Sequence, residues 1–191
     1  LTVNSLLEDL EIIVGSAQAI LSIKEDLIGP ARQQRVRTFG IEELVRETVA
    51  GMGLPSEVVE FEFAADLPFL RADRVQIKRV FINLFKNAME AMAECAERRL
   101  HIAARLAEKP GFMAIEVTDS GSGIPPELLD KIWVAFFTTK GNSGGTGLGL
   151  PACAQIVGNL GGEITIASEV GVGTTFTVTL PLAAAETGNQ R

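Results

Sequence analysis

The spacing of apolar residues separates a helical N-terminal segment from a longer region of mixed helix and strand. Over residues 1–30, apolar positions recur at steps of three and four, which is the heptad pattern of a bundled helix. A second apolar stripe runs beside the first, so the face is wider than one partner helix would cover. Gly29 and Pro30 then end or kink the helix. The first stripe comprises Val3, Leu6, Leu10, Ile13, Ala17, Ile20 and Leu27, with Lys24 at one heptad position, and the second comprises Leu7, Val14, Leu21 and Ile28.

Two interpretations of this helix stay open. The helix packs on its own domain, or it enters a bundle formed between chains. We favour the intermolecular bundle because the pattern persists for about four heptads. The sequence thus predicts a dimerisation-type helix over residues 1–37, which includes a basic connector at residues 31–37.

Beyond residue 37 the periodicity becomes that of a domain with helices and strands. The last two strands are joined by a short glycine-containing turn, so we expect them to form an antiparallel hairpin. The order of elements predicts an α+β sandwich, one mixed sheet with helices on one face, over residues 38–183, followed by a tail at residues 184–191. The predicted helices cover residues 41–52, 72–98 and 146–159, and the predicted strands cover residues 57–64, 100–107, 112–119, 162–168 and 173–181.

The composition narrows the classes of function. The chain has 191 residues, of which 47% are hydrophobic, and a net charge of −7. An acidic chain without a strongly basic run is a poor nucleic-acid binder, so we expect no nucleic-acid partner. Cys95 and Cys153 form no CxxC pair, which favours a reducing, cytoplasmic location. No apolar run reaches the roughly 18 residues of a membrane span. The chain begins at Leu1, and we expect it to be part of a longer protein whose membrane anchoring stays open.

Residues 141–149, with the sequence GNSGGTGLG, contain five glycines directly before a predicted helix. The stretch matches neither the P-loop nor the dinucleotide fingerprint, because no Lys-Ser or Lys-Thr follows and Leu150 occupies the last glycine position. Bare backbone before a helix nevertheless lets a ligand approach, and the free N–H groups of a helix N-terminus favour an anion. A flexible surface turn is the alternative for this stretch taken alone.

Three further stretches carry chemistry that favours a nucleotide. In DSGSGIP, residues 119–125, Asp119 can accept a hydrogen bond from an exocyclic amine, and the glycines let a ring lie against backbone. In NLFKNAMEAM, residues 83–92, Asn83 and Asn87 share one helix face, and an amide oxygen suits Mg²⁺. FFTTK, residues 136–140, supplies two hydroxyls and an ammonium. All of these motifs in this order make a specific signal for a bound nucleotide.

The motif order resembles the ATP-binding catalytic domain of sensor histidine kinases, in the superfamily that includes gyrase and Hsp90. The four stretches, with GVGTTF at residues 171–176, resemble the N, G1, F, G2 and G3 boxes, and the match covers residues 39–182. The FFTTK and NAMEAM forms are most similar to the nitrogen-regulator branch. The resemblance implies a Bergerat-type ATP sandwich with a mobile lid between the G1 and G2 boxes. It also implies Mg²⁺ at Asn87, adenine at Asp119, and phosphates near Lys140 and residues 145–149.

The resemblance implies a nucleotide site made from five segments. Whether Lys86 reaches a phosphate or only a neighbouring carboxylate stays open. The expected ATP-contacting residues are Asn83, Lys86, Asn87, Asp119, Gly121, Gly123, Ile124, Phe137, Thr138, Thr139, Lys140, Gly145, Thr146, Gly147, Leu148, Gly149, Leu150 and Thr174.

The reaction class depends on Asn83, because relatives that hydrolyse ATP carry a glutamate base at that position. An amide cannot take a proton, so we expect a domain that positions Mg-ATP while another segment supplies a histidine nucleophile. The single histidine, His101, lies in a predicted strand and is interpreted as structural. Residues 1–37 would then be the second helix of a homodimeric histidine-phosphotransfer bundle, and a response regulator would be the partner. A non-catalytic nucleotide-sensing scaffold is the alternative.

Overall fold

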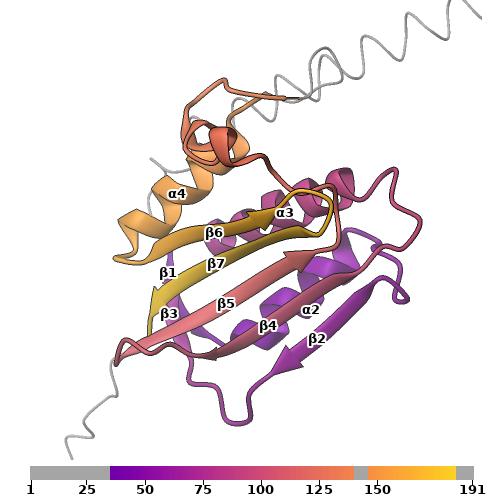
Figure 1. Cartoon of the computed structure of the whole chain (residues 1–191). Helices are drawn as coiled ribbons and strands as arrows, with labels where there is room; N and C mark the ends of the chain where they lie inside the picture. The colour runs from indigo at the N-terminus through magenta and orange to yellow at the C-terminus, as the bar shows by residue number, and fades with distance from the viewer. Residues whose placement is uncertain (1–34, 140–145, 184–191) are drawn as a thin grey trace, which may run out of the picture.

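In the computed structural model, which describes residues 35–139 and 146–183, a five-stranded mixed sheet forms the centre of the fold. Its strand order is β2-β4-β5-β7-β6, and β2 is parallel to β4 while the other neighbours are antiparallel (Figure 1). The strands are β2 (Val59–Phe63), β4 (Leu100–Leu106), β5 (Phe112–Asp119), β6 (Glu163–Glu169) and β7 (Gly173–Pro181). The mixed sheet and its closing hairpin were predicted from the sequence and are confirmed.

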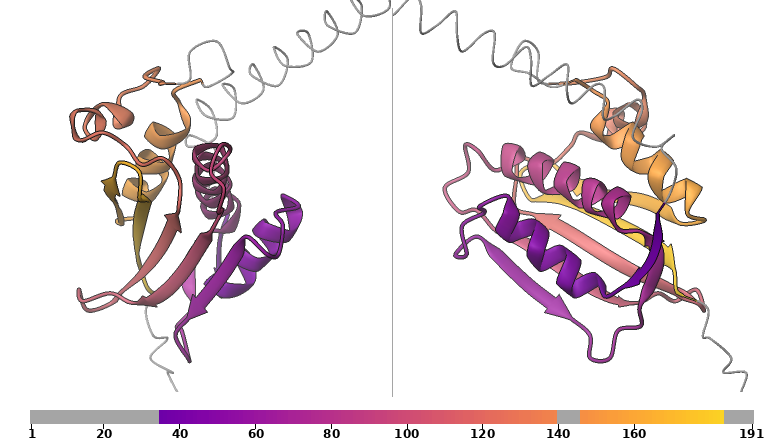
Figure 2. Two further views of the ribbon diagram at one scale, coloured as in Figure 1. Left: turned by 45° about the vertical axis from the view of Figure 1, so that its right-hand side comes forward. Right: turned by 180° about the vertical axis from the view of Figure 1, so that it is seen from behind.

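Three helices pack on one face of this sheet, as the views from the side and from behind show (Figure 2). Each helix has a buried apolar stripe at helical spacing, which gives the sheet a continuous core. On the longest helix, Ile77, Phe81, Leu84 and Phe85 are fully buried. The helices are α2 (Ile41–Gly51), α3 (Arg74–Ala91) and α4 (Gly149–Asn159).

A second, two-stranded sheet was not predicted. Strand β1 (Val36–Phe39) pairs antiparallel with β3 (Leu70–Asp73), so part of the segment interpreted as a connector is a strand. The pairing is supported by the Asp73 carboxylate, which accepts from the backbone N–H of Arg35 at 2.8 Å. The sequence signal was weak because three of the four β1 side chains are exposed.

The prediction of a helix over residues 72–98 was wrong at both ends. Asp73 is the N-cap, and its side chain accepts from the backbone N–H of Val75 at 2.9 Å, so α3 starts at Arg74. The helix ends at Ala91, whose carbonyl accepts from the backbone N–H of Ser122. This tertiary contact, with the loop after β5, takes one of the free carbonyls of the last turn.

The start of α4 was also predicted too early, at residue 146 rather than Gly149, because Gly147 has a positive φ of 66° that a helix does not adopt. The loop expected before it holds two short 3₁₀ turns, η2 (Pro126–Leu128) and η3 (Lys131–Trp133). Residues 1–34, with the predicted heptad helix, and the tail from residue 184 lie outside the described residues. Within the described residues, no helix is long and apolar enough to cross a membrane.

Candidate nucleotide-binding site

Asp119 is the buried carboxylate at the end of β5. Only 5% of the residue is exposed, and its side chain accepts from the backbone N–H of Gly121 at 2.8 Å and from the backbone of Thr174. Burial raises the pKa of the Asp119 carboxyl above 3.8, while these two hydrogen bonds lower it. A carboxylate has about four acceptor positions, so Asp119 can still accept from a ligand amine.

The segment after Asp119 follows the neighbouring backbone with no room for side chains. A Cβ at Gly121 would lie 2.7 Å from both the Ala91 Cβ and the Asp119 Oδ1. Gly123 has a φ of 69°, and a Cβ there would overlap the backbone carbonyl of Glu169. Both glycines are therefore needed to keep this loop beside the Asp119 carboxylate.

A hydroxyl network joins the same loop to the β6–β7 hairpin. The backbone N–H of Ile124 donates to Ser168 Oγ at 2.8 Å, and Ser168 Oγ lies 2.9 Å from Thr174 Oγ1. Ser168 also contacts the carbonyl oxygen of Gly173 at 3.0 Å. The structure thus places the predicted residues Ile124 and Thr174 together, through a residue that sequence reasoning missed. Its only signal was a serine at the end of a predicted strand, opposite Thr174 across the hairpin.

The segment between the two glycine-rich regions is anchored at Trp133 and at Phe136. Trp133 packs edge-on against Phe176, with ring centroids 6.2 Å apart, and serves as a hydrophobic anchor. The backbone N–H of Phe136 donates to the carbonyl of Gly147 at 3.0 Å. A Cβ at Gly147 would lie 2.5 Å from the Phe136 carbonyl carbon, so glycine permits this contact. Phe137 is half-buried, whereas Thr138 and Thr139 are exposed. Lys140 and Gly145 lie outside the described residues.

Helix α3 presents Asn83, Lys86 and Asn87 toward the start of α4 and the adjoining solvent. Asn83 Nδ2 donates to the carbonyl oxygen of Gly149 at 3.3 Å, so this amide connects the two helices. Lys86 is exposed and lies 3.9 Å from the Glu90 carboxylate one turn later. Asn87 is half-buried, one turn after Asn83.

The N-terminus of α4 completes the site. Leu148 is buried and precedes the helix, with its N–H 3.4 Å from Thr146 Oγ1, and Leu150 packs against the core. The first backbone N–H groups of an α-helix have no intrahelical acceptor, and they carry the positive end of the helix dipole. The arrangement therefore combines an anion-binding helix end, a buried carboxylate acceptor and a loop without side chains. These are the features that bind phosphates at one end of a ligand and a base amine at the other.

Comparison with known proteins supports this description. Residues 72–184 match the family model described as "Histidine kinase-, DNA gyrase B-, and HSP90-like ATPase". The chain is 40% identical over 144 residues to the two-component sensor PprA of Pseudomonas aeruginosa, covering 72% of this chain and 16% of PprA. It is 30% identical over 189 residues to the histidine kinase/phosphatase NtrB of Vibrio alginolyticus, covering 93% of this chain and 53% of NtrB. The chain thus spans much less than the full length of these relatives.

Solved structures show the same fold. The catalytic domain of the histidine kinase ThkA is 32% identical with a TM-score of 0.64, over 78% of this chain and 97% of that domain. A complex of ThkA with the response regulator TrrA matches 95% of this chain and 53% of the ThkA chain, with 27% identity and a TM-score of 0.73. The fold class predicted from the sequence is confirmed by these matches.

Proposed function

Because the chain belongs to the histidine kinase-, DNA gyrase B- and HSP90-like ATPase family, as an ATP-binding catalytic domain of the sensor histidine kinase type, we propose that it binds Mg-ATP and positions the γ-phosphoryl group for transfer to a histidine supplied elsewhere. The observation that carries the proposal is the buried Asp119 carboxylate, held beside a loop in which neither Gly121 nor Gly123 has space for a Cβ. A flat base needs this kind of contact with backbone, and its amine needs the carboxylate.

Residues around Asp119 fit the adenine end of ATP. Thr174 and Ser168 hold the hairpin next to the carboxylate, and Ile124 closes the loop through Ser168. In this proposal Asp119 accepts from the exocyclic amine, and Gly121 and Gly123 lie against the ring. The loop contacts α3 through the Ser122 N–H, which donates to the Ala91 carbonyl, and it contacts the hairpin through Ser168.

At the phosphate end, we place the anionic groups at the N-terminus of α4, where the N–H groups of Gly149 and Leu150 lack helical acceptors. Asn87 is the protein ligand that we propose for Mg²⁺, with phosphate oxygens and water completing the shell. Among the described residues there is no cluster of three His, Cys, Asp or Glu side chains for a metal.

The chemistry that this chain contributes is positioning rather than proton transfer. Asn83 donates to the Gly149 carbonyl and has no basic group, so it stabilises the start of α4 instead of activating a nucleophile. Bound ATP would supply the phosphoryl group. The chain's residues orient it for in-line attack by an imidazole nitrogen, with ADP as the leaving group.

The remaining parts of the proposal concern partners. We propose that the part of residues 1–37 that precedes β1 forms a homodimer helix, that the chain from β1 to residue 183 forms the ATP-binding domain, and that the phosphorylated histidine passes its group to a response regulator. ThkA, which was solved with a response regulator, supports this assignment by similarity. The cytoplasmic location stays a prediction.

A nucleotide-sensing scaffold without kinase activity is the second candidate. The observation that favours it is the position of His101. The chain has no other histidine, and His101 lies on β4, where its Nε2 is 3.2 Å from the Glu62 carboxylate. His101 lies opposite Thr118, the neighbour of Asp119, but its side chain is directed to the exposed Glu62 and not to the buried Asp119 carboxylate. The two candidates differ in whether a histidine on a separate helix receives phosphate.

The test is incubation with γ-labelled ATP, with and without a bundle helix that carries a histidine followed by Glu or Asp. We expect ATP binding by calorimetry, no label on the chain alone, and label on the added histidine. Label on a serine or on His101 would refute the proposed reaction. ATP binding without transfer to any supplied histidine would favour the scaffold, and absence of ATP binding would refute the site itself.

A further inference from the structure

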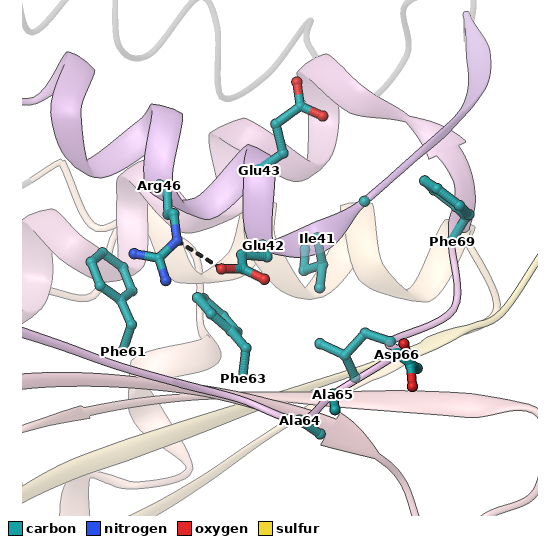
Figure 3. A pocket seen from close by; sticks show the side chains of 12 residues that line it. Ile41, Glu42, Glu43, Arg46, Phe61, Phe63, Ala64, Ala65, Asp66 and Phe69 are labelled. Carbon is teal, nitrogen blue, oxygen red and sulfur yellow. Dashed lines mark hydrogen bonds and ion pairs between the residues drawn. The ribbon is translucent and has the colours of Figure 1, made fainter.

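A shallow groove lies between α2, β2 and the loop to β3, and it shares no residue with the proposed ATP site. Its volume is about 730 Å³. Phe61, Phe63 and Phe69 provide aromatic surface, and Glu42 and Asp66 lie at its rim (Figure 3). The Arg46 guanidinium lies 4.4 Å from the centroid of the Phe61 ring and pairs with Glu42 at 2.9 Å. Phe69 is 60% exposed, so the groove presents apolar surface to solvent.

Strand β2 borders this groove and forms one edge of the five-stranded sheet. On its inner side, the Val58 carbonyl accepts from Leu100 and the Ala64 N–H donates to Ala104. Because the N–H and C=O of one residue point to the same side of a strand, the even-numbered residues from 58 to 64 face β4. The backbone groups of Val59, Phe61 and Phe63 therefore face the open edge, where no strand pairs with them within the described residues.

The two faces of β2 specify what a further strand would need. Phe61 and Phe63 face the groove, while Glu60 and Glu62 are exposed on the opposite face. On the β4 side, these carboxylates lie near basic groups, Glu60 at 3.4 Å from Arg99 and Glu62 at 3.2 Å from His101. Beside these carboxylates, β4 thus places Leu100 and Ile102 in the core and His101 on the acidic face. A strand added at the open edge of β2 would meet the same two faces, an apolar face toward the groove and an acidic face on the opposite side.

The charge around the edge identifies the occupant. Three acidic residues, Glu42, Glu43 and Asp66, line the groove together with one cation, Arg46. On the other face of β2, the exposed carboxylates of Glu60 and Glu62 have Arg99 and His101 as neighbours. A second copy of β2 would bring its Glu60 and Glu62 against these two carboxylates, and like charges opposite each other destabilise strand pairs. A basic segment has the complementary charge.

We propose that the β2 edge binds an extended segment of a partner protein as a sixth strand. Apolar side chains of this segment enter the groove beside Phe61 and Phe63, and basic side chains lie beside Glu60 and Glu62. Three residues of β2 supply main-chain hydrogen bonds, which give affinity independent of sequence, and the alternating side chains give specificity. This docking surface is independent of ATP binding.

The experiment uses the 191-residue chain and a capped peptide with the sequence of residues 99–106, which has the required alternation. Titration is followed by amide NMR, and hydrogen exchange is measured with and without peptide. We expect saturable shifts at Val59, Phe61 and Phe63 and slower exchange of their amides. The double variant Glu60→Lys/Glu62→Lys should weaken binding about fivefold or more, as should about 1 M salt. Glu163→Lys, on the exposed face of β6 at the opposite edge, is the matched control and should have no effect.

Several results would overturn the proposal. Absence of saturable shifts at millimolar peptide would show that the edge does not accept a strand. Binding that ignores both charge reversal and salt would exclude a basic partner as the specific occupant. Slow exchange at Val59, Phe61 and Phe63 in the free chain would show that the edge is already covered. Dependence of that protection on protein concentration would identify a second copy, and independence would identify a segment of the same chain.

Discussion

Replacing Asp119 by asparagine tests the adenine end of the proposed site with almost no change in shape. The carboxylate accepts from the backbone groups of Gly121 and Thr174 and, in our proposal, from the base amine. An amide has one oxygen and an NH₂ group that only donates. If the amide oxygen keeps the hydrogen bond from the Gly121 N–H, the NH₂ group faces two other donors, the Thr174 N–H and the ligand amine. Two donors cannot pair, so the hydrogen bond to the ligand is lost.

The magnitude follows from the charge of the acceptor. A hydrogen bond to a charged group contributes roughly 1.5–3 kcal/mol, and each 1.4 kcal/mol is a factor of ten in affinity. We therefore expect Asp119→Asn to weaken ATP binding by about ten- to 150-fold. Because the Thr174 N–H also loses an acceptor, some loss of stability should accompany the loss of affinity.

The assay is calorimetric titration with ATP, with thermal unfolding of each variant measured separately. Glu116→Gln is the matched control, since Glu116 lies on the same strand but pairs with Arg105 at 2.7 Å. It should leave ATP affinity unchanged. Unchanged ATP affinity in folded Asp119→Asn would remove Asp119 from the site and refute the observation on which the proposed function rests.

The same pair of variants has a second readout in the pH dependence of stability. Burial raises the pKa of Asp119 in the folded chain above 3.8, so the folded state binds more protons than the unfolded state in that range. The contribution of Asp119 to the free energy of unfolding therefore decreases as pH rises from about 3.8 through the raised pKa. Asp119→Asn should remove this decrease, and Glu116→Gln should keep it.

Three further substitutions test other parts of the site. Asn87→Ala should weaken Mg-ATP binding much more than metal-free adenosine binding in calorimetry, and equal losses would show a structural role. Ser168→Ala leaves the Ile124 N–H without its acceptor, so ATP affinity should fall several-fold while tripolyphosphate affinity does not, and Ser168→Thr should restore it. Gly147→Ala should lower the free energy of unfolding in urea by more than about 1 kcal/mol, because its φ is 66° and its Cβ would meet the Phe136 backbone. Gly158→Ala, in open space on α4, is the control and should be neutral or stabilising by about 0.5–1 kcal/mol, so equal effects would refute the reasoning.

The sequence predicted the main sheet because its strands are apolar segments with partial alternation, and because two of the connections, at Gly111 and Gly171, are glycine-containing turns. It did not predict β1 or β3, because strands of four residues are too short to show a clear period, and β1 is also largely exposed. The end of α3 was missed for another reason. Glu94 and Arg98 suit a helix, and the contact that ends it, from Ser122 to Ala91, comes from a loop about thirty residues later.

The site was predictable to the extent that it depends on local backbone. At positions 123 and 147, positive φ angles and close backbone contacts require glycine. Because the required residue is itself a glycine, the sequence shows this part of the site directly. The contacts that join the segments were not visible. Asn83 reaches Gly149 across 66 positions of sequence, and Ile124 reaches Ser168 across 44. Such pairs are fixed by the packing of helices and strands, not by spacing along the chain.

Asn83 shows how these two kinds of information combine. From the sequence, the residue indicates only what is missing, a side chain able to take a proton. The structure adds that its amide donates to the Gly149 carbonyl at the start of α4. A carboxylate at this position would face a carbonyl oxygen, and two acceptors cannot form a hydrogen bond. The amide therefore stabilises the helix end that we assign to the phosphates, while it leaves this position without a base. Both properties belong in a domain that holds ATP in place until a separate segment brings the nucleophile.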